Sequence, residues 1–298
     1  MTLKELLDGI ETVEVTGDTS CEITGIVYDS RRVTPGALFV ALHGEKADGT
    51  AYIEDAIERG ASAVVSQSPC ASGGHFPCIQ VADARLALAK LAVSFYGHPA
   101  SRLCTIGITG TNGKTTVSFM LREILKAAGR RPGLLGTVRY EIGDRVLPAS
   151  RTTPESVDLQ FMFAQMERAG CDSAVMEVSS HALAQHRVEG ILYDAAVFTN
   201  LTQDHLDYHG TLEEYFNVKS RLFSQVSRFA VINCDDPWGK RLLTERKFLA
   251  RLVSYGFEEG AAVRGLNPVT DTKGSRMHVR SPWGEVEIKL SLIGRFNL

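Results

Sequence analysis

A glycine-rich segment between an apolar run and an amphipathic stretch constrains this chain more than any other feature. Residues 107–116 read Gly-Ile-Thr-Gly-Thr-Asn-Gly-Lys-Thr-Thr and follow the apolar run Leu103–Ile106. Apolar residues then recur at helical spacing from Val117 to Ala128, and Gly129 supplies the stop. A strand, a glycine-rich turn and a helix N-terminus in this order cradle phosphates, because backbone N–H groups and the helix dipole face the anion. The segment therefore predicts a nucleotide-phosphate site.

The match to the usual P-loop pattern is incomplete. That pattern has four residues between its first glycine and Gly-Lys, and Ile108 stands where this glycine would be, with glycines at 107 and 110 instead. An ordinary glycine-rich turn would explain the glycines, but it would not explain a Lys-Thr-Thr at residues 114–116, in the first turn of a helix. We therefore predict a variant P-loop, in which Lys114 reaches the outer phosphates and a threonine hydroxyl holds Mg²⁺.

Composition sets broad limits on the class of protein. A chain of 298 residues has room for about two domains, and 44% hydrophobic with 22% charged residues is ordinary for a soluble globular protein. The net charge of −3 gives no electrostatic case for nucleic acid or membrane surfaces, and no apolar run approaches the length that spans a bilayer. The six scattered cysteines favour reduced thiols in a cytoplasmic enzyme. Oligomeric state is not readable from the sequence.

The chain divides near residues 97–102, where Gly97 and Pro99 follow an apolar helix pattern. We expect a small α/β domain over residues 1–99 and a second domain over residues 100–298. Strands and helices alternate beyond residue 103, which indicates a mostly parallel sheet with helices on both faces. Alternating residues on both sides of Pro282–Gly284 predict an appended antiparallel hairpin. The expected elements are helices near 3–10, 52–59, 83–97, 117–128, 153–170 and 212–222, and strands near 36–42, 63–65, 103–106, 172–178, 195–199, 229–233, 252–255, 277–280 and 285–290.

Polar residues at two predicted strand ends are candidates for metal binding. Glu177 ends an apolar strand, and the carboxyl ends of parallel strands line the crevice in which such sheets bind ligands. Its carboxylate could hold Mg²⁺, or it could be a surface group at a strand end. His205 and His209 follow another strand end, but no glutamate adjoins His205, so a zinc-binding H-E-x-x-H interpretation fails. His205 could help to hold Mg²⁺ or orient phosphate, or it could be structural.

Lys219 is the least expected residue of the chain. A capping box at Thr211–Glu214 starts a helix whose apolar stripe includes Tyr215, and Lys219 lies on that stripe. The lysine stem could pack while its ammonium reaches water. Alternatively, burial could lower its pKa, so that a neutral amine adds CO₂ and becomes a carbamate ligand for Mg²⁺.

Together these motifs resemble the Mur ligases, the ATP-dependent amide-forming enzymes of peptidoglycan precursor synthesis. The matching stretches are residues 109–116, 177–181, 200–207 and Lys219. Within the family the chain most resembles the MurE type, which adds the third residue to UDP-N-acetylmuramoyl-L-alanyl-D-glutamate. The stretches that carry this closer resemblance are residues 28–31, 35–41, 151–154 and 185–188.

The resemblance implies ATP and Mg²⁺ as cofactors, with UDP-N-acetylmuramoyl-L-alanyl-D-glutamate and a diamino acid as substrates. It makes residues 1–99 the domain that binds the UDP-sugar peptide and residues 100–298 the ATP-binding domain. The implied nucleotide residues are Gly110, Thr111, Asn112, Gly113, Lys114, Thr115 and Thr116. The implied catalytic and metal residues are Lys114, Thr115, Glu177, His205 and a carbamylated Lys219. The implied substrate residues are Ser30, Thr152, Thr153, Ser179, Gln185 and Arg187.

Family members carry a third domain that selects the incoming amino acid, and we expect it to be missing from this sequence. The sequence stops within Gly294–Asn297, a motif that resembles part of the family's adenine pocket, so we expect a truncated product that completes the reaction poorly. Diaminopimelate is favoured over L-lysine only because it is common in the family. The alternatives are a related ligase, such as a folylpolyglutamate synthetase, and a non-catalytic nucleotide-binding protein.

Overall fold

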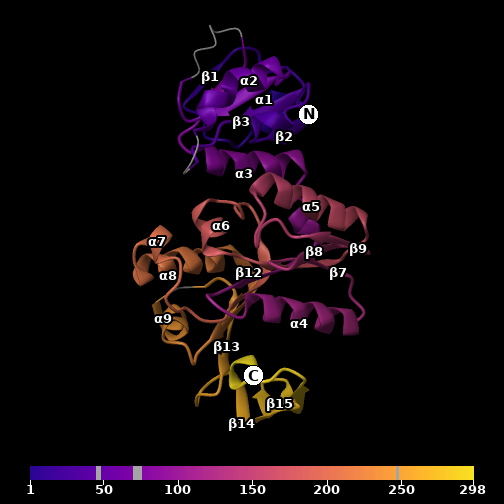
Figure 1. The fold of residues 1–298 in the computed structure, drawn as a ribbon, viewed down its shortest axis with the longest axis vertical. Coiled ribbons are helices and arrows are strands. Elements are labelled where there is room, and N and C mark those ends of the chain that lie inside the picture. The colour runs from indigo at the N-terminus through magenta and orange to yellow at the C-terminus, as the bar shows by residue number, and fades with distance from the viewer. Residues whose placement is uncertain (45–47, 70–75, 246–247) are drawn as a thin grey trace. The chain divides into compact units, whose positions relative to one another are not determined.

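The computed structural model describes residues 1–44, 48–69, 76–245 and 248–298. They form two compact units (Figure 1). The N-terminal unit comprises Met1–Arg102, Pro154–Arg168 and Ala184–Ile191, and the P-loop unit comprises Leu103–Thr153, Ala169–Leu183 and Leu192–Leu298. Two segments beyond residue 99 thus cluster with the N-terminal unit. None of the helices in these ranges combines the length and the apolar character that crossing a bilayer requires.

The described part of the N-terminal unit has one five-stranded sheet in the order β1-β5-β4-β3-β2, parallel except for β1. Its strands are β1 (Glu14–Thr16), β2 (Gly25–Val27), β3 (Ala37–Val40), β4 (Ala63–Ser66) and β5 (Cys78–Gln80). Its helices are α1 (Leu3–Leu6), α2 (Ile53–Glu58), α3 (Ala84–Phe95) and α5 (Ser156–Arg168). Caps explain where two of them begin. Thr2 forms a capping box with Glu5, and Asp83 accepts hydrogen bonds from two N–H groups of α3.

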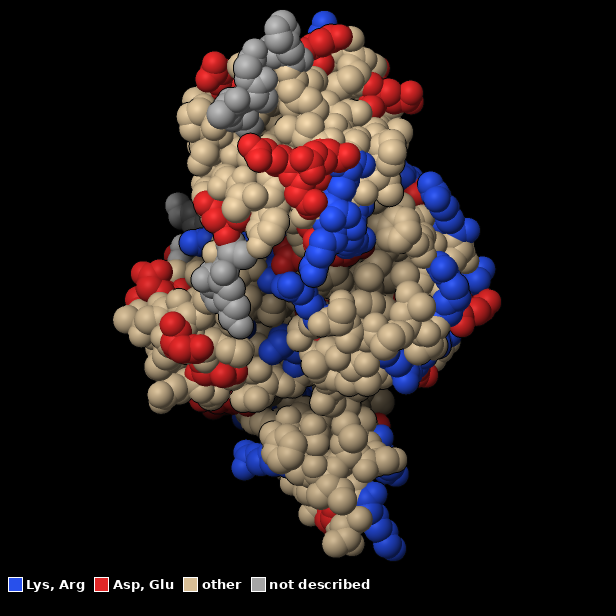
Figure 2. Space-filling view, turned by 45° about the horizontal axis from the view of Figure 1, so that its top comes forward, with Lys and Arg blue, Asp and Glu red and all other residues tan. Residues whose placement is uncertain are grey.

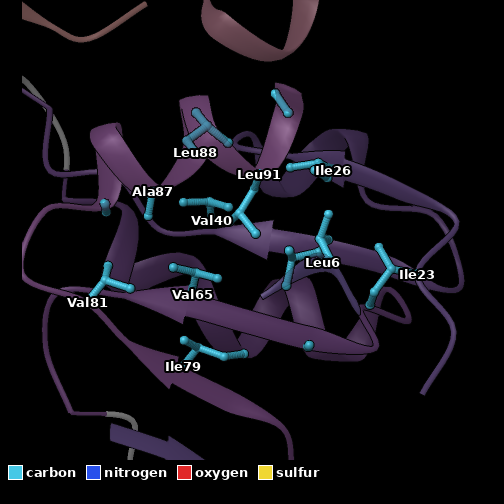
Figure 3. Close-up of a cluster of buried hydrophobic side chains, with 14 of the residues drawn as sticks. Leu6, Ile23, Ile26, Val40, Val65, Ile79, Val81, Ala87, Leu88 and Leu91 are labelled. Atoms are coloured by element: carbon cyan, nitrogen blue, oxygen red, sulfur yellow. The ribbon is translucent and has the colours of Figure 1, made fainter. Parts of the chain in front are cut away.

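Both faces of this sheet are buried, and β3 shows why. Leu38 and Val40 belong to one buried cluster, whereas Ala37 and Phe39 belong to another, as the two-residue period of a strand requires. Figure 3 shows Leu88 and Leu91 of α3 packed in the first cluster with side chains from the sheet. Helices therefore cover the sheet from both sides, which favours parallel strands.

The expectation of six reduced thiols is wrong at one position. Cys78, at the start of β5, is disulfide-bonded. Cys21, Cys104, Cys171 and Cys234 are free, and Cys70 lies outside the described residues.

The described part of the P-loop unit has one sheet of eleven strands, in the order β16-β15-β14-β13-β12-β11-β6-β10-β7-β8-β9. Its strands are β6 (Cys104–Thr109), β7 (Pro132–Leu135), β8 (Arg139–Ile142), β9 (Arg145–Pro148), β10 (Ser173–Glu177), β11 (Tyr193–Phe198), β12 (Val226–Asn233), β13 (Arg251–Gly256), β14 (Val263–Asp271), β15 (Gly274–Ser281) and β16 (Gly284–Leu290). The remaining helices are α4 (Lys114–Ala127), α6 (Ser180–Ala184), α7 (Leu206–His209), α8 (Leu212–Ser220) and α9 (Pro237–Glu245).

The fold class is confirmed: the strands from β14 to β7 are parallel, and antiparallel strands extend both edges. The predicted hairpin is β15–β16, whereas the β8–β9 hairpin and β14 were not predicted. Strand β6 lies between β10 and β11, with Ile108 opposite Glu177 and Thr109 opposite Phe198. The carboxyl ends of three strands thus meet directly beside the glycine-rich loop.

Charged side chains of both signs occupy the face seen in Figure 2, rather than a continuous surface of one sign. This distribution agrees with the net charge of −3 and gives no electrostatic argument for a polyanionic partner on that face.

Candidate active site

The glycine-rich loop is shorter than the sequence suggests. Strand β6 continues to Thr109, so the loop proper is Gly110–Gly113, and α4 begins at Lys114. Gly110 and Gly113 have φ values of 148° and 87°, which favour glycine. A Cβ at Gly110 would also collide with the hydroxyl of Thr199. Gly107 serves packing in the strand instead, since a Cβ there would meet the Tyr193 ring at 2.9 Å.

The segment that follows β11 holds this loop in place. The N–H of Thr111 donates to the carbonyl of Asn200 at 2.9 Å, and the N–H of Asn112 donates to Asn200 Oδ1 at 3.0 Å. The hydroxyl of Thr199 donates to the carbonyl of Asn112 at 2.6 Å. Further along, the N–H of Thr202 donates to Thr111 Oγ1 at 3.0 Å. These hydrogen bonds hold the loop in one shape, so it is preorganised for a ligand.

Two lysines, Lys114 and Lys219, donate hydrogen bonds to backbone carbonyl groups of the loop. Lys114 Nζ donates to the carbonyls of Gly110 and Thr111 at 2.8 and 2.9 Å, and burial lowers its pKa. Lys219 Nζ donates to the carbonyl of Gly110 at 3.0 Å and lies 4.6 Å from the centroid of the Tyr215 ring. Only 1% of Lys219 is exposed, so the idea that its ammonium reaches water is wrong. Burial first, and the charge of Lys114 second, hold the pKa of Lys219 well below its ordinary value.

Glu177 is buried rather than a surface carboxylate, with 1% of the residue exposed. Thr115 Oγ1 donates to its Oε2 at 3.0 Å. Thr137 donates twice, from its N–H to Oε1 at 2.9 Å and from its hydroxyl to Oε2 at 3.0 Å. The hydroxyl of Thr137 also lies 3.0 Å from that of Thr152. Three donors thus fix a buried acid beside the first turn of α4.

His205 lies at the start of α7 in a left-handed backbone conformation, with φ of 51°. Its ring makes an edge contact with His181 at 4.8 Å between centroids. His209, one turn later, lies 2.9 Å from the Ser180 hydroxyl through Nε2, and burial lowers its pKa to about 4. The aromatic cluster therefore joins the start of α6 to α7.

One cavity of about 280 Å³ collects most of the predicted site residues of the P-loop unit. Its lining residues are Thr111, Asn112, Gly113, Lys114, Thr115, Thr116, Thr137, Thr152, Glu177, Ser179 and His205. Gly110, Thr153 and Lys219 are not in this lining. Thr153 is 1% exposed, and its hydroxyl donates to the Glu177 carbonyl at 2.8 Å and accepts from the Ser179 N–H at 3.0 Å. It therefore braces the end of β10.

A second cavity of about 430 Å³ shares Gly113 and Thr116 with the first. Aromatic and aliphatic side chains line much of it, together with Asn200, Asn233 and Asp235. The carboxylate of Asp235 accepts from the N–H groups of Phe257 and Glu258 and so fixes the turn after β13. Residues 295–298 also line this cavity, including Phe296 and Asn297 of the motif singled out in the sequence.

The other three predicted substrate residues belong to the N-terminal unit. Ser30 is buried, at the start of a short 3₁₀ helix that Asp29 caps. Arg187 donates to Gln185 Oε1 at 2.6 Å and pairs with buried Glu155, with 3.1 Å between Nη2 and Oε1. Breaking such a buried pair typically costs about 3–5 kcal/mol, so Arg187 is held in one position.

The chemistry of the lining suits phosphate and a hard cation. A P-loop with its lysine binds phosphate, and the Glu177 carboxylate with the Thr115 hydroxyl offers the oxygen ligands that Mg²⁺ prefers. Within the described ranges, no three His, Cys, Asp or Glu side chains gather in a way that could hold a metal. The predicted set contains only two residues of those types, Glu177 and His205, so a metal here would need the hydroxyl and a modified lysine.

Sequence reasoning missed Thr137 and the bracing role of Thr199. Thr137 follows the apolar run that forms β7, and a polar residue at a strand end was the signal that led to Glu177. The partners of Thr199 could not be inferred, because they depend on which strands are neighbours.

Two family models match most of this chain. The Mur ligase middle domain model matches residues 108–298, and the Mur ligase family, catalytic domain model matches residues 22–96. A UDP-N-acetylmuramoyl-L-alanyl-D-glutamate–2,6-diaminopimelate ligase of Caldanaerobacter subterraneus subsp. tengcongensis is 43% identical over 298 residues, which are 100% of this chain and 61% of that protein. A UDP-N-acetylmuramyl-tripeptide synthetase of Roseiflexus sp. is 44% identical over 294 residues, covering 93% of this chain and 58% of that protein.

Solved structures show the same fold. A UDP-N-acetylmuramoyl-L-alanyl-D-glutamate–2,6-diaminopimelate ligase aligns with a TM-score of 0.86 and 27% identity, over 100% of this chain and 61% of that one. A mycobacterial folylpolyglutamate synthase aligns with a TM-score of 0.56 and 22% identity, over 69% of this chain and 54% of that one. The chain spans 61% and 58% of the length of the two curated relatives named above.

Proposed function

This chain belongs to the Mur ligase family, and we propose that it supplies the nucleotide and UDP-sugar sites of an ATP-dependent ligase that adds a diamino acid to UDP-N-acetylmuramoyl-L-alanyl-D-glutamate. The observation that carries the proposal is the cavity in which Lys114, Thr115, Glu177 and His205 converge. The names of two similar proteins specify 2,6-diaminopimelate, which favours diaminopimelate as the added residue, with L-lysine as the alternative.

ATP occupies the two adjoining cavities in this proposal. Its phosphates lie in the smaller cavity, against the backbone of residues 110–116 and Lys114. Its base lies in the larger, more apolar cavity, which begins at Gly113 and Thr116 and reaches Asn297. The shared residues lie at the first turn of α4, where the dipole favours negative charge.

In this proposal Thr115, Glu177, His205 and a carbamylated Lys219 would hold Mg²⁺. The carbamate forms when the neutral amine of Lys219 attacks CO₂ and releases a proton. Burial and the neighbouring charge of Lys114 favour that neutral amine. The product is an anion beside Lys114, so one modification replaces a repulsive pair with an attractive one. Bound Mg²⁺ would offset charge on the transferring phosphoryl group.

The UDP-sugar peptide contacts Ser30, Thr152, Thr153, Ser179, Gln185 and Arg187 in this proposal, and residues 1–99 form its main binding domain. Arg187, held by Glu155 and Gln185, supplies a fixed cation for an anionic group of this substrate. For Thr153, which is buried, the proposed role is to position Ser179.

The reaction uses ATP to convert a poor leaving group into a good one. The side-chain carboxylate of D-glutamate attacks the γ-phosphorus of ATP, ADP leaves, and an acyl phosphate forms. The amine of the diamino acid attacks the acyl carbon, inorganic phosphate leaves, and an amide results. Lys114 stabilises the charge that builds on the phosphoryl group, because its ammonium is preorganised against the loop.

Binding measurements on residues 1–298 test the proposal. We expect calorimetry to detect both Mg²⁺·ADP and UDP-N-acetylmuramoyl-L-alanyl-D-glutamate, and Lys114→Ala to weaken only ADP, by about tenfold or more. Failure to bind the UDP-sugar peptide would favour a folylpolyglutamate synthetase-like ligase. The non-catalytic alternative is tested by joining a Mur ligase C-terminal domain after Leu298, and absence of ADP release from ATP with either diamino acid would then favour it.

A further inference from the structure

We propose that Thr137 is a positioning residue that fixes the Glu177 carboxylate for the metal and makes Thr152 a hydrogen-bond acceptor toward the UDP-sugar peptide. The inference rests on the proposed function, since it assigns Glu177 to the metal and Thr152 to the substrate. It concerns a residue of the cavity wall for which the sequence motifs give no role.

Two neighbouring residues restrict where the Glu177 carboxylate can lie. Thr137 donates its N–H to Oε1 at 2.9 Å and its hydroxyl to Oε2 at 3.0 Å, so it holds both oxygens. A Cβ at Gly136 would collide with Oε1, so the carboxylate could not keep this position beside any other residue at 136. The carboxylate is therefore fixed by residues 136 and 137 before any metal binds. Thr115 Oγ1, in the first turn of α4, also donates to Oε2 at 3.0 Å.

The hydroxyl protons of this group have one arrangement. An ionised carboxylate only accepts, so the Thr137 hydroxyl spends its single proton on Glu177. Toward Thr152, 3.0 Å away, Thr137 can then only accept, and the Thr152 hydroxyl must be the donor. Because the Thr152 hydroxyl donates its proton to Thr137, it presents only lone pairs to the cavity that it lines. The substrate group that meets Thr152 is therefore an N–H or O–H, not a carboxylate or a phosphate.

Thr137 is exposed at the cavity wall, unlike the threonines that brace the sheet. Thr105, at the opposite end of β6, is 0% exposed, and its hydroxyl donates to the Leu103 carbonyl. Removing the Thr137 hydroxyl should therefore leave the core intact. This contrast supplies a matched control, because Thr105→Val deletes a hydroxyl from the same sheet without touching the cavity.

The first experiment measures how much Mg²⁺ strengthens ADP binding, by calorimetry in Mg²⁺ and in EDTA. We expect Thr137→Val to reduce that Mg²⁺-dependent gain about tenfold, the size of one charge-assisted hydrogen bond. Thr137→Ser and Thr105→Val should keep the gain, and the Kd in EDTA should stay unchanged in all three variants. Gly136→Ala, which displaces Glu177 but leaves the Thr137 hydroxyl, should lose the gain as well.

A Thr137→Val chain that keeps the full gain, or a Thr137→Ser chain that loses it, would overturn the positioning role. If Mg²⁺ does not strengthen ADP binding to the natural chain, the metal assignment of the proposed function is wrong. The role of Thr137 in positioning Glu177 for the metal is then wrong as well. A variant whose Kd in EDTA also rises has lost loop structure, which would count against a specific effect on the metal.

The second experiment is a double-mutant cycle on binding of UDP-N-acetylmuramoyl-L-alanyl-D-glutamate. Thr137→Val frees the Thr152 proton, so its effect should vanish once Thr152 is valine. We expect the two single losses to exceed the double loss by about fivefold or more. Additive losses would show that Thr152 does not depend on Thr137, and would overturn the acceptor assignment even if the metal result holds.

Discussion

Lys114 and Lys219 donate to the same acceptor, the carbonyl oxygen of Gly110, at 2.8 and 3.0 Å. The two ammonium groups therefore lie close enough to repel each other, and the charge of Lys114 contributes to the low pKa of Lys219. The properties of each lysine should consequently change when the other is replaced.

Replacing Lys114 should impair both phosphate stabilisation and modification of Lys219. We expect Lys114→Met to lower turnover of the ligase by about 10²–10³. Without the neighbouring charge, the pKa of Lys219 rises and less neutral amine is available for CO₂. Mass spectrometry of the intact chain under CO₂ should then show less carbamylated protein. Unchanged carbamylation would contradict electrostatic coupling of the two lysines.

Lys219→Met should stabilise the unmodified chain, while removing the amine that the proposed carbamate needs. Buried Lys219 has a pKa well below 10.5 in the folded state, so between these values the unfolded state binds more protons. The free energy of unfolding therefore rises with pH through that window. Replacing the lysine should raise stability at pH 7 by roughly 1 kcal/mol or more and flatten this dependence. Urea unfolding at pH 7 and 9 measures both effects, with exposed Lys126→Met as the control.

His209 should make the fold sensitive to mild acid. Burial lowers the pKa of His209 to about 4, from an ordinary value of 6.5. The unfolded state therefore takes up a proton first as pH falls, and stability is lost between pH 6.5 and 4 but kept above 6.5. His209→Asn should flatten this part of the stability curve, whereas His278→Asn, at an exposed position on β15, should not. An unchanged slope in His209→Asn would assign the acid sensitivity to other groups.

Gly110→Ala should disrupt the loop, because the methyl group meets the Thr199 hydroxyl and the φ of 148° is unfavourable. We expect ADP binding to fall by about 10²-fold or more as the loop N–H groups are misdirected. Gly129→Ala is the matched control, since its φ is 76° but its Cβ would lie in open space. That variant should cost only about 1 kcal/mol in stability and leave ADP binding intact. Equal ADP affinities in the two variants would refute the steric argument.

Local signals predicted much of the fold. The cap at Thr211 involves a group three residues away, so spacing alone identified it. The apolar stripe around Tyr215 likewise predicted that Lys219 faces inward. By contrast, the helix expected near residues 212–222 ends at Ser220, and Ile124, within the predicted apolar pattern of α4, is 62% exposed. Element ends and helix faces depend on what packs against them, which periodicity does not reveal.

Long-range pairing accounts for the part of the site that was not predicted. That β6 lies between β10 and β11 follows from pairings between residues about 70 to 90 positions apart. The pairing of β6 with β11 brings Thr199 under the loop, and the pairing of β10 with β7 brings Thr137 beside Glu177. Motifs could name Glu177 as a candidate, but its donors come from another strand end. The roles carried over by family resemblance stay predictions until the ligands are measured.

The left-handed backbone at His205 indicates that this protein gives up some stability in order to hold a side chain in place before a ligand binds. A glycine there would relax the chain, so His205→Gly should fold at least as well as the natural sequence. The chain instead keeps a strained backbone at the wall of a cavity. This backbone presents the His205 imidazole to the cavity before any ligand binds. Selection for stability alone would therefore replace this histidine, and only an assay of ligand binding would detect the replacement.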